Sequence, residues 1–158
     1  MIIIGYQGIG KSSLAGKNNC IDLESGNFWI DGQRHEKWYE VYCNIALHLH
    51  HQGYTVFISS HQVVRDHLKA ISTSDEWDHI FVCYPEISLQ SSWIHKLEAR
   101  FKNTGLDKDY KAWQNAVCRY ADNIRELEFS GFKKIPLETM NYSLAEEIQL
   151  AKLRCPNI

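Results

Sequence analysis

The sequence lacks the features that mark several common classes of protein. No apolar run is long enough to span a membrane. The 17 Lys and Arg residues are balanced by 19 Asp and Glu, so no basic face of the kind used for nucleic-acid binding is indicated. Only three prolines and no low-complexity tract occur, which leaves no sign of a linker. We therefore expect one compact domain over residues 1–158, with no nucleic-acid or membrane partner.

The five cysteines form no recognisable pattern. Their number is odd and no two have the spacing of metal ligands, which disfavours both a disulfide framework and a structural zinc. We interpret them as reduced, mostly buried thiols. No basic leader precedes the first apolar run, and both observations together predict a cytoplasmic protein. The five are Cys20, Cys43, Cys83, Cys118 and Cys155.

Apolar runs typical of buried strands alternate with residues at helical spacing along the whole chain. This alternation predicts an α/β fold, with a parallel sheet of five strands and helices on both faces. The expected strands are residues 1–4, 20–23, 54–59, 79–84 and 132–137, and the expected helices lie at 11–17, 34–51, 64–71, 93–101, 113–127 and 144–151.

One stretch near the amino end carries a specific chemistry. Residues 5–12, GYQGIGKS, fit the pattern G-x-x-x-x-G-K-[ST]. Glycines allow a tight loop whose backbone N–H groups point at a phosphate, and a helix that begins at Lys11 adds its positive end. Lys11 would bridge the β- and γ-phosphates, and the Ser12 hydroxyl would bind Mg²⁺.

The motif therefore predicts a nucleoside triphosphate site, with ATP and Mg²⁺ as cofactors. A chance match is the alternative, but the apolar run before the motif and the helix-forming segment after it favour binding. The expected binding residues are Gly5, Gly8, Ile9, Gly10, Lys11, Ser12 and Ser13.

Two motifs that accompany this loop in other classes are missing. No N-K-x-D sequence follows a later strand, and the third strand ends in Ser59, Ser60 and His61 with no acid. These absences disfavour GTPase switches and ATPase motors, and they leave the second Mg²⁺ ligand unassigned. Of the classes of protein considered for this loop, a small phosphotransferase is the one that remains.

Over nearly its full length the chain resembles the P-loop nucleotide and small-metabolite kinases. These include nucleoside monophosphate kinases, gluconate and shikimate kinases and short phage-type kinases. After the loop, the similar segments are, in order, CIDLES, FISSHQVVRDHLK, IFVCYPE with WIHKLEAR, and FKKIPLETMNYSLAEEI. The resemblance implies the three-layer P-loop NTPase fold with strand order 2-3-1-4-5.

Candidate residues for the phosphate acceptor follow the second and third strands, because ligands bind at the carboxyl ends of strands in such sheets. Asp22 resembles the acceptor-side acid of the family, and Glu24 lies two residues further on. Arg65 could bind an acceptor phosphate or carboxylate through its planar fork, or pair with a neighbouring acid on its helix.

Arg100 precedes a short, polar, glycine-containing segment, residues 101–112, which we predict to be a lid. With Lys11 and Asp22, Arg100 is a predicted catalytic residue that stabilises charge on the moving phosphoryl group. Arg119 and Arg125 lie on a helix that resembles the arginine-bearing helix after the lid in monophosphate kinases, and surface ion pairs are the alternative. Lys96 and Lys108 are predicted to face solvent.

Three functions stay open. The leading one is a kinase that transfers the γ-phosphoryl group of ATP to a nucleoside or deoxynucleoside monophosphate, as a monomer or homodimer. The aromatic segment at 28–42 favours a planar acceptor, through Phe28 and Trp29. The second is a kinase of a small non-nucleotide acceptor of the gluconate or shikimate type. The third, favoured by the missing acid, is a non-catalytic nucleotide-binding protein of DNA metabolism.

Overall fold

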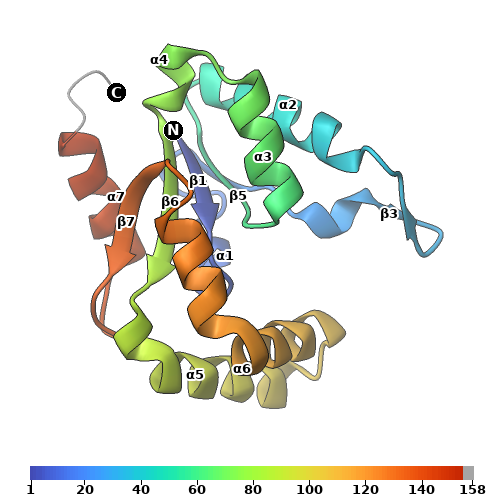
Figure 1. Ribbon diagram of the computed structural model, residues 1–158, viewed down its shortest axis with the longest axis vertical. Coiled ribbons are helices and arrows are strands. Elements are labelled where there is room, and N and C mark those ends of the chain that lie inside the picture. Colours follow the sequence, from blue (N-terminus) through green and yellow to red (C-terminus); the bar gives the residue numbers. More distant parts are fainter. Residues whose placement is uncertain (155–158) are drawn as a thin grey trace.

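A parallel sheet of five strands forms the centre of the computed structural model, which describes residues 1–154 except the side chain of Ile30 (Figure 1). Its strands are β1 (Ile2–Gly5), β2 (Cys20–Asp22), β5 (Thr55–Ser59), β6 (Ile80–Pro85) and β7 (Lys133–Leu137), in the spatial order β2-β5-β1-β6-β7. All four strand pairings are parallel. The predicted α/β class with a five-stranded parallel sheet is confirmed. Cys155, one of the five cysteines predicted to be reduced thiols, lies outside the described residues.

The labels β3 and β4 belong to a separate two-stranded hairpin. When the strands of the main sheet alone are counted along the chain, their spatial order is 2-3-1-4-5. This order puts β1 in the middle, between β5 and β6. The segment that follows β1 therefore leaves the sheet at its centre.

Both faces of the sheet are buried. Successive residues of a strand point to opposite faces, and Ile2, Ile3 and Ile4 are each 0% exposed. The same holds for Val56, Phe57 and Ile58 of β5, which are as apolar as a strand covered on both faces requires. Four of the cysteines are free thiols, and of these Cys118 is exposed.

The helices connect the strands in chain order. They are α1 (Lys11–Leu14), α2 (Trp38–His51), α3 (Gln62–Ile71), α4 (Ser74–Trp77), α5 (Gln90–Thr104), α6 (Asp107–Glu128) and α7 (Leu144–Leu153), with short 3₁₀ turns at Ser25–Phe28 and Ile87–Leu89. Within residues 1–154, no helix has the length and apolar character needed to cross a bilayer.

The first helix is shorter than predicted. It ends at Leu14 because Ala15 adopts φ −54° and ψ 129°, and Gly16 follows with φ 77°. A helix of four residues has a small dipole, so the contribution expected from the helix N-terminus is reduced. Any anion held near Lys11 depends instead on individual N–H groups and side chains.

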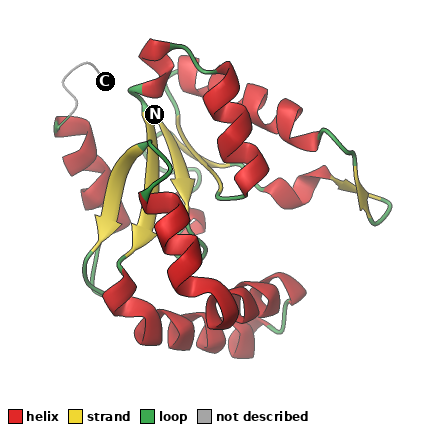
Figure 2. Ribbon diagram, in the orientation of Figure 1, coloured by secondary structure: helices red, strands yellow, loops and turns green. Residues whose placement is uncertain are grey.

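A hairpin that the sequence analysis missed projects from the body of the protein (Figures 1 and 2). Its strands are β3 (Trp29–Ile30) and β4 (Gln33–Arg34), joined by Asp31 and Gly32 with φ 49° and 77°. An Asp-Gly pair with two positive φ angles is the usual two-residue hairpin turn, and this signal was readable in the sequence.

The predicted lid, residues 101–112, is mostly helical. It contains the end of α5, a turn at Gly105 and Leu106, and the beginning of α6. Figure 1 shows α5 and the first part of α6 beyond the carboxyl ends of β6 and β7. Inside α6 the backbone leaves helical geometry at Arg119, with φ −139° and ψ 19°.

Candidate functional site

Residues 5–12, here called the glycine loop, lie at the carboxyl end of β1. A Cβ on Gly5 would come within 2.7 Å of Ile9 Cδ1 and 2.9 Å of Lys11 Cδ, so glycine lets the Lys11 stem lie against the strand. Gly8 has φ +84°, and a Cβ there would approach Leu97 Cδ2 to 2.9 Å. Close packing therefore requires glycine at position 5, and both the backbone conformation and close packing require it at position 8.

Side chains from distant elements hold the carbonyl groups of the glycine loop. Trp93 Nε1 of α5 donates a hydrogen bond to Gln7 O at 3.0 Å. Tyr142 Oη, between β7 and α7, donates to Ile9 O at 2.9 Å. Gln7 Nε2 donates to Ala112 O of α6 at 2.8 Å. The loop is thus attached by hydrogen bonds to α5, to α6 and to the segment between β7 and α7.

Most amides of the loop have no such partner, although the Tyr6 N–H donates to Cys83 O at 2.8 Å. Within residues 1–154, no hydrogen bond uses the backbone N–H of residues 7–10, and the N–H groups of Lys11 and Ser12 belong to the first turn of α1, where helices leave them unpaired. Consecutive unpaired amides can together bind one anionic oxygen-rich group.

A cavity of about 510 Å³ opens beside the glycine loop, and we call it the large cavity because it is the larger of the two that the loop lines. It lies at the carboxyl ends of β1, β2 and β5, between α3 and α6. Most predicted site residues line it: Gly5, Gly8, Lys11, Ser12, Asp22, Glu24, Arg65, Arg100 and Arg119. The fold therefore brings together predicted residues as far apart in the sequence as Gly5 and Arg119.

A second cavity of about 320 Å³, the small cavity, lies on another side of the same loop. Its wall contains residues 8–12 together with Lys96, Leu97 and Arg100 of α5, so the predicted Ile9 and Gly10 belong here. The two cavities share Gly8, Lys11, Ser12 and Arg100.

Two predicted residues line neither cavity. Arg125 points away from the site: its side chain is 61% exposed and pairs with Asp122 at 3.9 Å. The structure thus shows the surface ion pair that was the alternative for Arg125, and its acceptor role stays a prediction. Arg125 follows Arg119 by six residues, about one and two-thirds turns of helix, so the two side chains leave α6 on different faces. Ser13 is exposed, and its hydroxyl donates to Gly10 O at 2.6 Å.

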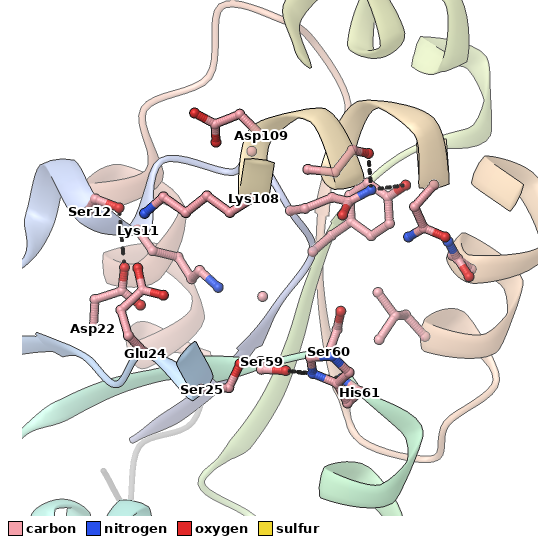
Figure 3. A pocket seen from close by; sticks show the side chains of 18 of the residues that line it. Lys11, Ser12, Asp22, Glu24, Ser25, Ser59, Ser60, His61, Lys108 and Asp109 are labelled. Carbon is pink, nitrogen blue, oxygen red and sulfur yellow. Dashed lines mark hydrogen bonds between the residues drawn. The ribbon is translucent and has the colours of Figure 1, made fainter. Parts of the chain in front are cut away.

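Lys11, Ser12 and Asp22 meet at the floor of the large cavity (Figure 3). Ser12 Oγ donates to Asp22 Oδ2 at 3.3 Å. Burial lowers the pKa of Lys11, and the carboxylates of Asp22 and Glu24 oppose that shift. Burial raises the pKa of Asp22, while Lys11 lowers it. Each charge is thus partly compensated by the other inside the cavity.

The Ser12 and Asp22 oxygens suit a Mg²⁺ ion. Both are hard oxygen ligands, and Mg²⁺ is typically held by one or two protein groups together with substrate phosphates and water. Within residues 1–154 no group of three or more His, Cys, Asp or Glu side chains could hold a metal by itself. An ion here would need ligands from a bound phosphate.

At the other end of the large cavity, one carboxylate bridges two arginines. Glu126 Oε2 accepts from Arg65 Nη2 at 3.1 Å, and Glu126 Oε1 accepts from Arg119 Nη2 at 3.0 Å. Arg65 is 8% exposed and also donates to Ser60 O. Two guanidinium groups and one carboxylate leave a net positive charge in this part of the wall.

Arg100 lines both cavities and is oriented by a buried acid. Its Nη2 donates to Asp109 Oδ1 at 2.8 Å, and Asp109 Oδ2 accepts from Thr104 Oγ1 at 2.6 Å. Asp109 is 3% exposed. Arg100 Nε is also buried, without a hydrogen-bond partner in the described part of the chain.

Both lysines that were expected in solvent border a cavity. Lys108 is exposed, as expected, and its side chain extends from the start of α6 across the large cavity toward Ser12 and Asp22 (Figure 3). Lys96, also expected in solvent, is half-buried in the wall of the small cavity. Phe28 and Trp29, proposed to stack on a planar acceptor, line neither cavity: Phe28 packs on Trp38 and Tyr42, and Trp29 lies on the hairpin.

The sequence analysis also missed a set of amide side chains. Gln7, Gln62, Asn115 and Asn123 all line the large cavity. Asn115, Arg119 and Asn123 repeat every four residues on α6, which places them on one face of the helix. That polar repeat within an otherwise amphipathic helix was the signal available in the sequence.

Comparisons of the chain with protein-family models, with curated proteins and with solved structures found no match. The functional interpretation therefore depends on the geometry of the two cavities and the chemistry of their walls.

Proposed function

We propose that the protein is an ATP-dependent phosphotransferase with the P-loop NTPase fold, whose leading acceptor is a nucleoside or deoxynucleoside monophosphate. The observation that carries this proposal is the junction of the two cavities at Gly8, Lys11, Ser12 and Arg100. A phosphotransferase needs separate places for donor and acceptor, and they must meet at the group that moves.

The glycine loop supplies the donor half. Its unpaired amides and the Lys11 ammonium are suited to bind the β- and γ-phosphates of ATP. Ser12 and Asp22 would hold Mg²⁺, which neutralises phosphate charge when bound. Asp22 on β2 thus provides the carboxylate that is missing after β5.

The amide-rich wall supports a nucleotide acceptor. Side-chain amides present a donor and an acceptor side by side, which is the pattern that the edge of a nucleobase offers. The side chains of Asn115 and Gln62 make no hydrogen bond within residues 1–154, so both are available to a ligand. The acceptor's own phosphate would lie near Arg65 and Arg119, because paired guanidinium groups bind phosphate oxygens well.

The region where the cavities meet supports transfer itself. Arg100 reaches both cavities, so its guanidinium group can stabilise charge on the phosphoryl group during transfer. Lys108 and Asp109 come from the proposed lid, residues 101–112, whose closure would exclude water that competes with the acceptor.

A second candidate is a kinase of a small acceptor that carries a carboxylate, such as a sugar acid. The specific observation is that the Glu126 carboxylate already fits between Arg65 and Arg119. The carboxylate of a sugar acid could occupy the same place.

The test is to incubate the protein with ATP and Mg²⁺ and measure ADP formed with a panel of nucleoside monophosphates and sugar acids. ADP formation that depends on one monophosphate supports the leading acceptor, and dependence on a sugar acid supports the second. Lys11→Met should abolish turnover, whereas the exposed Lys17→Met should retain it. ATP binding without turnover on any acceptor would favour a non-catalytic nucleotide-binding protein. Absence of any ATP binding would refute the proposal.

A further inference from the structure

Lys96 and Arg100 lie one helical turn apart on α5, and both face the glycine loop across the small cavity. Lys11 completes the cationic part of the wall. The remaining wall is made of Leu97 and residues 8–12 of the loop. Among residues 1–154, no acidic side chain lines this cavity.

The Lys96 ammonium group is held in place by two aromatic rings. Its Nζ lies 4.2 Å from the ring centre of Trp93 and 5.0 Å from that of Tyr142. It donates a hydrogen bond to Tyr142 Oη at 3.0 Å, and the Tyr142 hydroxyl proton is directed to Ile9 O. One of the three ammonium protons is thus used, and two are available.

The charge of Lys96 is not compensated by an acid. Arg100 pairs with Asp109, but no ion pair within residues 1–154 involves Lys96. Burial and the nearby Arg100 lower the pKa of Lys96. Three cations around one small cavity repel one another, so this arrangement is suited to a ligand with several negative charges.

We propose that Lys96 is a second phosphate-binding cation for the donor, which contacts the polyphosphate from the side opposite the amides of the glycine loop. This inference rests on the proposed donor site. It adds that Lys96 recognises phosphate and not the nucleoside, because an ammonium group that lines the cavity offers a compact positive charge and N–H donors, which phosphate oxygens accept.

The probes are Mg²⁺-ATP and Mg²⁺-tripolyphosphate, which share three phosphates but differ in the nucleoside. Their affinities are measured by titration calorimetry on the wild-type protein and on Lys96→Met, which keeps an apolar stem of similar length over Trp93. Lys96→Met should weaken both ligands by about tenfold, the effect of losing one charge-assisted hydrogen bond. Lys96→Arg should restore most of the affinity of both.

Two further variants separate a direct contact from an indirect one. Lys102→Met, an exposed residue of the same helix that pairs with Glu98, should leave both affinities unchanged. Tyr142→Phe removes the hydrogen bonds to Lys96 and Ile9 but keeps the ammonium group, so it should weaken binding less than Lys96→Met. If Tyr142→Phe reproduces the full loss, Lys96 acts only through the loop and the proposal is wrong.

The outcomes distinguish this inference from the proposed function. If wild-type protein binds neither probe, the donor site itself is refuted. If it binds both and Lys96→Met changes neither, or weakens only ATP, the donor site stands and the role of Lys96 in phosphate binding is refuted. If Lys96→Met fails to fold in a ligand-free thermal melt, Lys96→Gln provides the same comparison.

Discussion

Replacement of Asp109 by Asn tests whether a buried carboxylate positions Arg100. Asp109 accepts hydrogen bonds from Arg100 at 2.8 Å and from Thr104 at 2.6 Å, and its side chain is 4% exposed. Asn keeps the shape and one oxygen but removes the charge. The ion pair with Arg100 is then reduced to a weaker hydrogen bond, and the contact with Thr104 can be kept.

The size of the effect follows from the exposure of the two partners. A hydrogen bond to a charged group contributes about 1.5–3 kcal/mol and a neutral one about 0.5–1.5 kcal/mol, so Asp109→Asn should lower the free energy of unfolding by about 1–2 kcal/mol. The larger loss typical of a fully buried ion pair is not expected, because the Arg100 side chain is 40% exposed and can be rehydrated.

Two assays on the same variant check this reasoning. Urea denaturation at about pH 7 gives the stability change, and the rate of ADP formation at saturating substrates gives kcat. We expect kcat to fall about tenfold, since misplacement of a group that stabilises the moving phosphoryl slows transfer. The matched control is Asp107→Asn, whose ion pair with Lys111 is 75% and 73% exposed, and which should change stability by under about 0.5 kcal/mol. Loss of stability with unchanged kcat would show that Asp109 serves the fold alone, and no change in either would refute the argument.

Three further predictions concern the loop, the arginine pair and the response to pH. Gly8→Ala should lower the free energy of unfolding by about 2–4 kcal/mol, because the position has a positive φ and an added Cβ would press on α5. Gly16→Ala, where φ is also positive but the space is open, should lower it by about 1–2 kcal/mol. Equal losses for the two variants in urea denaturation would contradict this. Glu126→Gln should lower the KM for an anionic acceptor two- to fivefold, about 0.5–1 kcal/mol, because the Glu126 carboxylate pairs with the two arginines that the acceptor needs. The control Asp122→Asn, on the same helix, should leave the KM unchanged. A raised KM in Glu126→Gln would show that Glu126 positions the two arginines. Burial lowers the pKa of His50 from 6.5 to about 4, so between these pH values the unfolded chain binds more protons than the folded protein. The free energy of unfolding should therefore fall by about 1–2 kcal/mol as the pH drops from 6.5 to 4, after allowance for partial exposure. His50→Gln should flatten this pH dependence, and an unchanged slope would exclude His50 as its source.

The fold was largely predictable because its strands are short and apolar on both faces, and because the segments between them carry apolar residues at helical spacing. Ile2, Ile3 and Ile4 form a continuous apolar run, which is typical of a strand buried on both faces, and Leu144, Ile148 and Ala151 recur at helical spacing. The hairpin at Trp29–Arg34 was missed because its strands have two residues each, too few for periodicity to appear. The length of α1 was overestimated because Ala15, although a good helix former, already has a non-helical ψ of 129°, and Gly16 follows with a positive φ.

The site was predictable where the chemistry is local. Gly5, Gly8, Gly10, Lys11 and Ser12 are close in sequence, so the shape of one loop fixes their spacing. Side chains from separate helices were predicted less well, since a helical residue's direction depends on how the helix packs.

The sequence by itself determined the parallel sheet and the glycine loop, because burial pattern and backbone conformation are properties of short segments. Tertiary structure alone decided that Asp22 meets Ser12, that Glu126 bridges Arg65 and Arg119, and that Arg125 faces solvent. It also decided that the Lys96 ammonium group contacts the rings of Trp93 and Tyr142 and that its side chain is half-buried. These contacts depend on strand order and on the rotation of α5 and α6 about their axes, which are set by packing across the whole core.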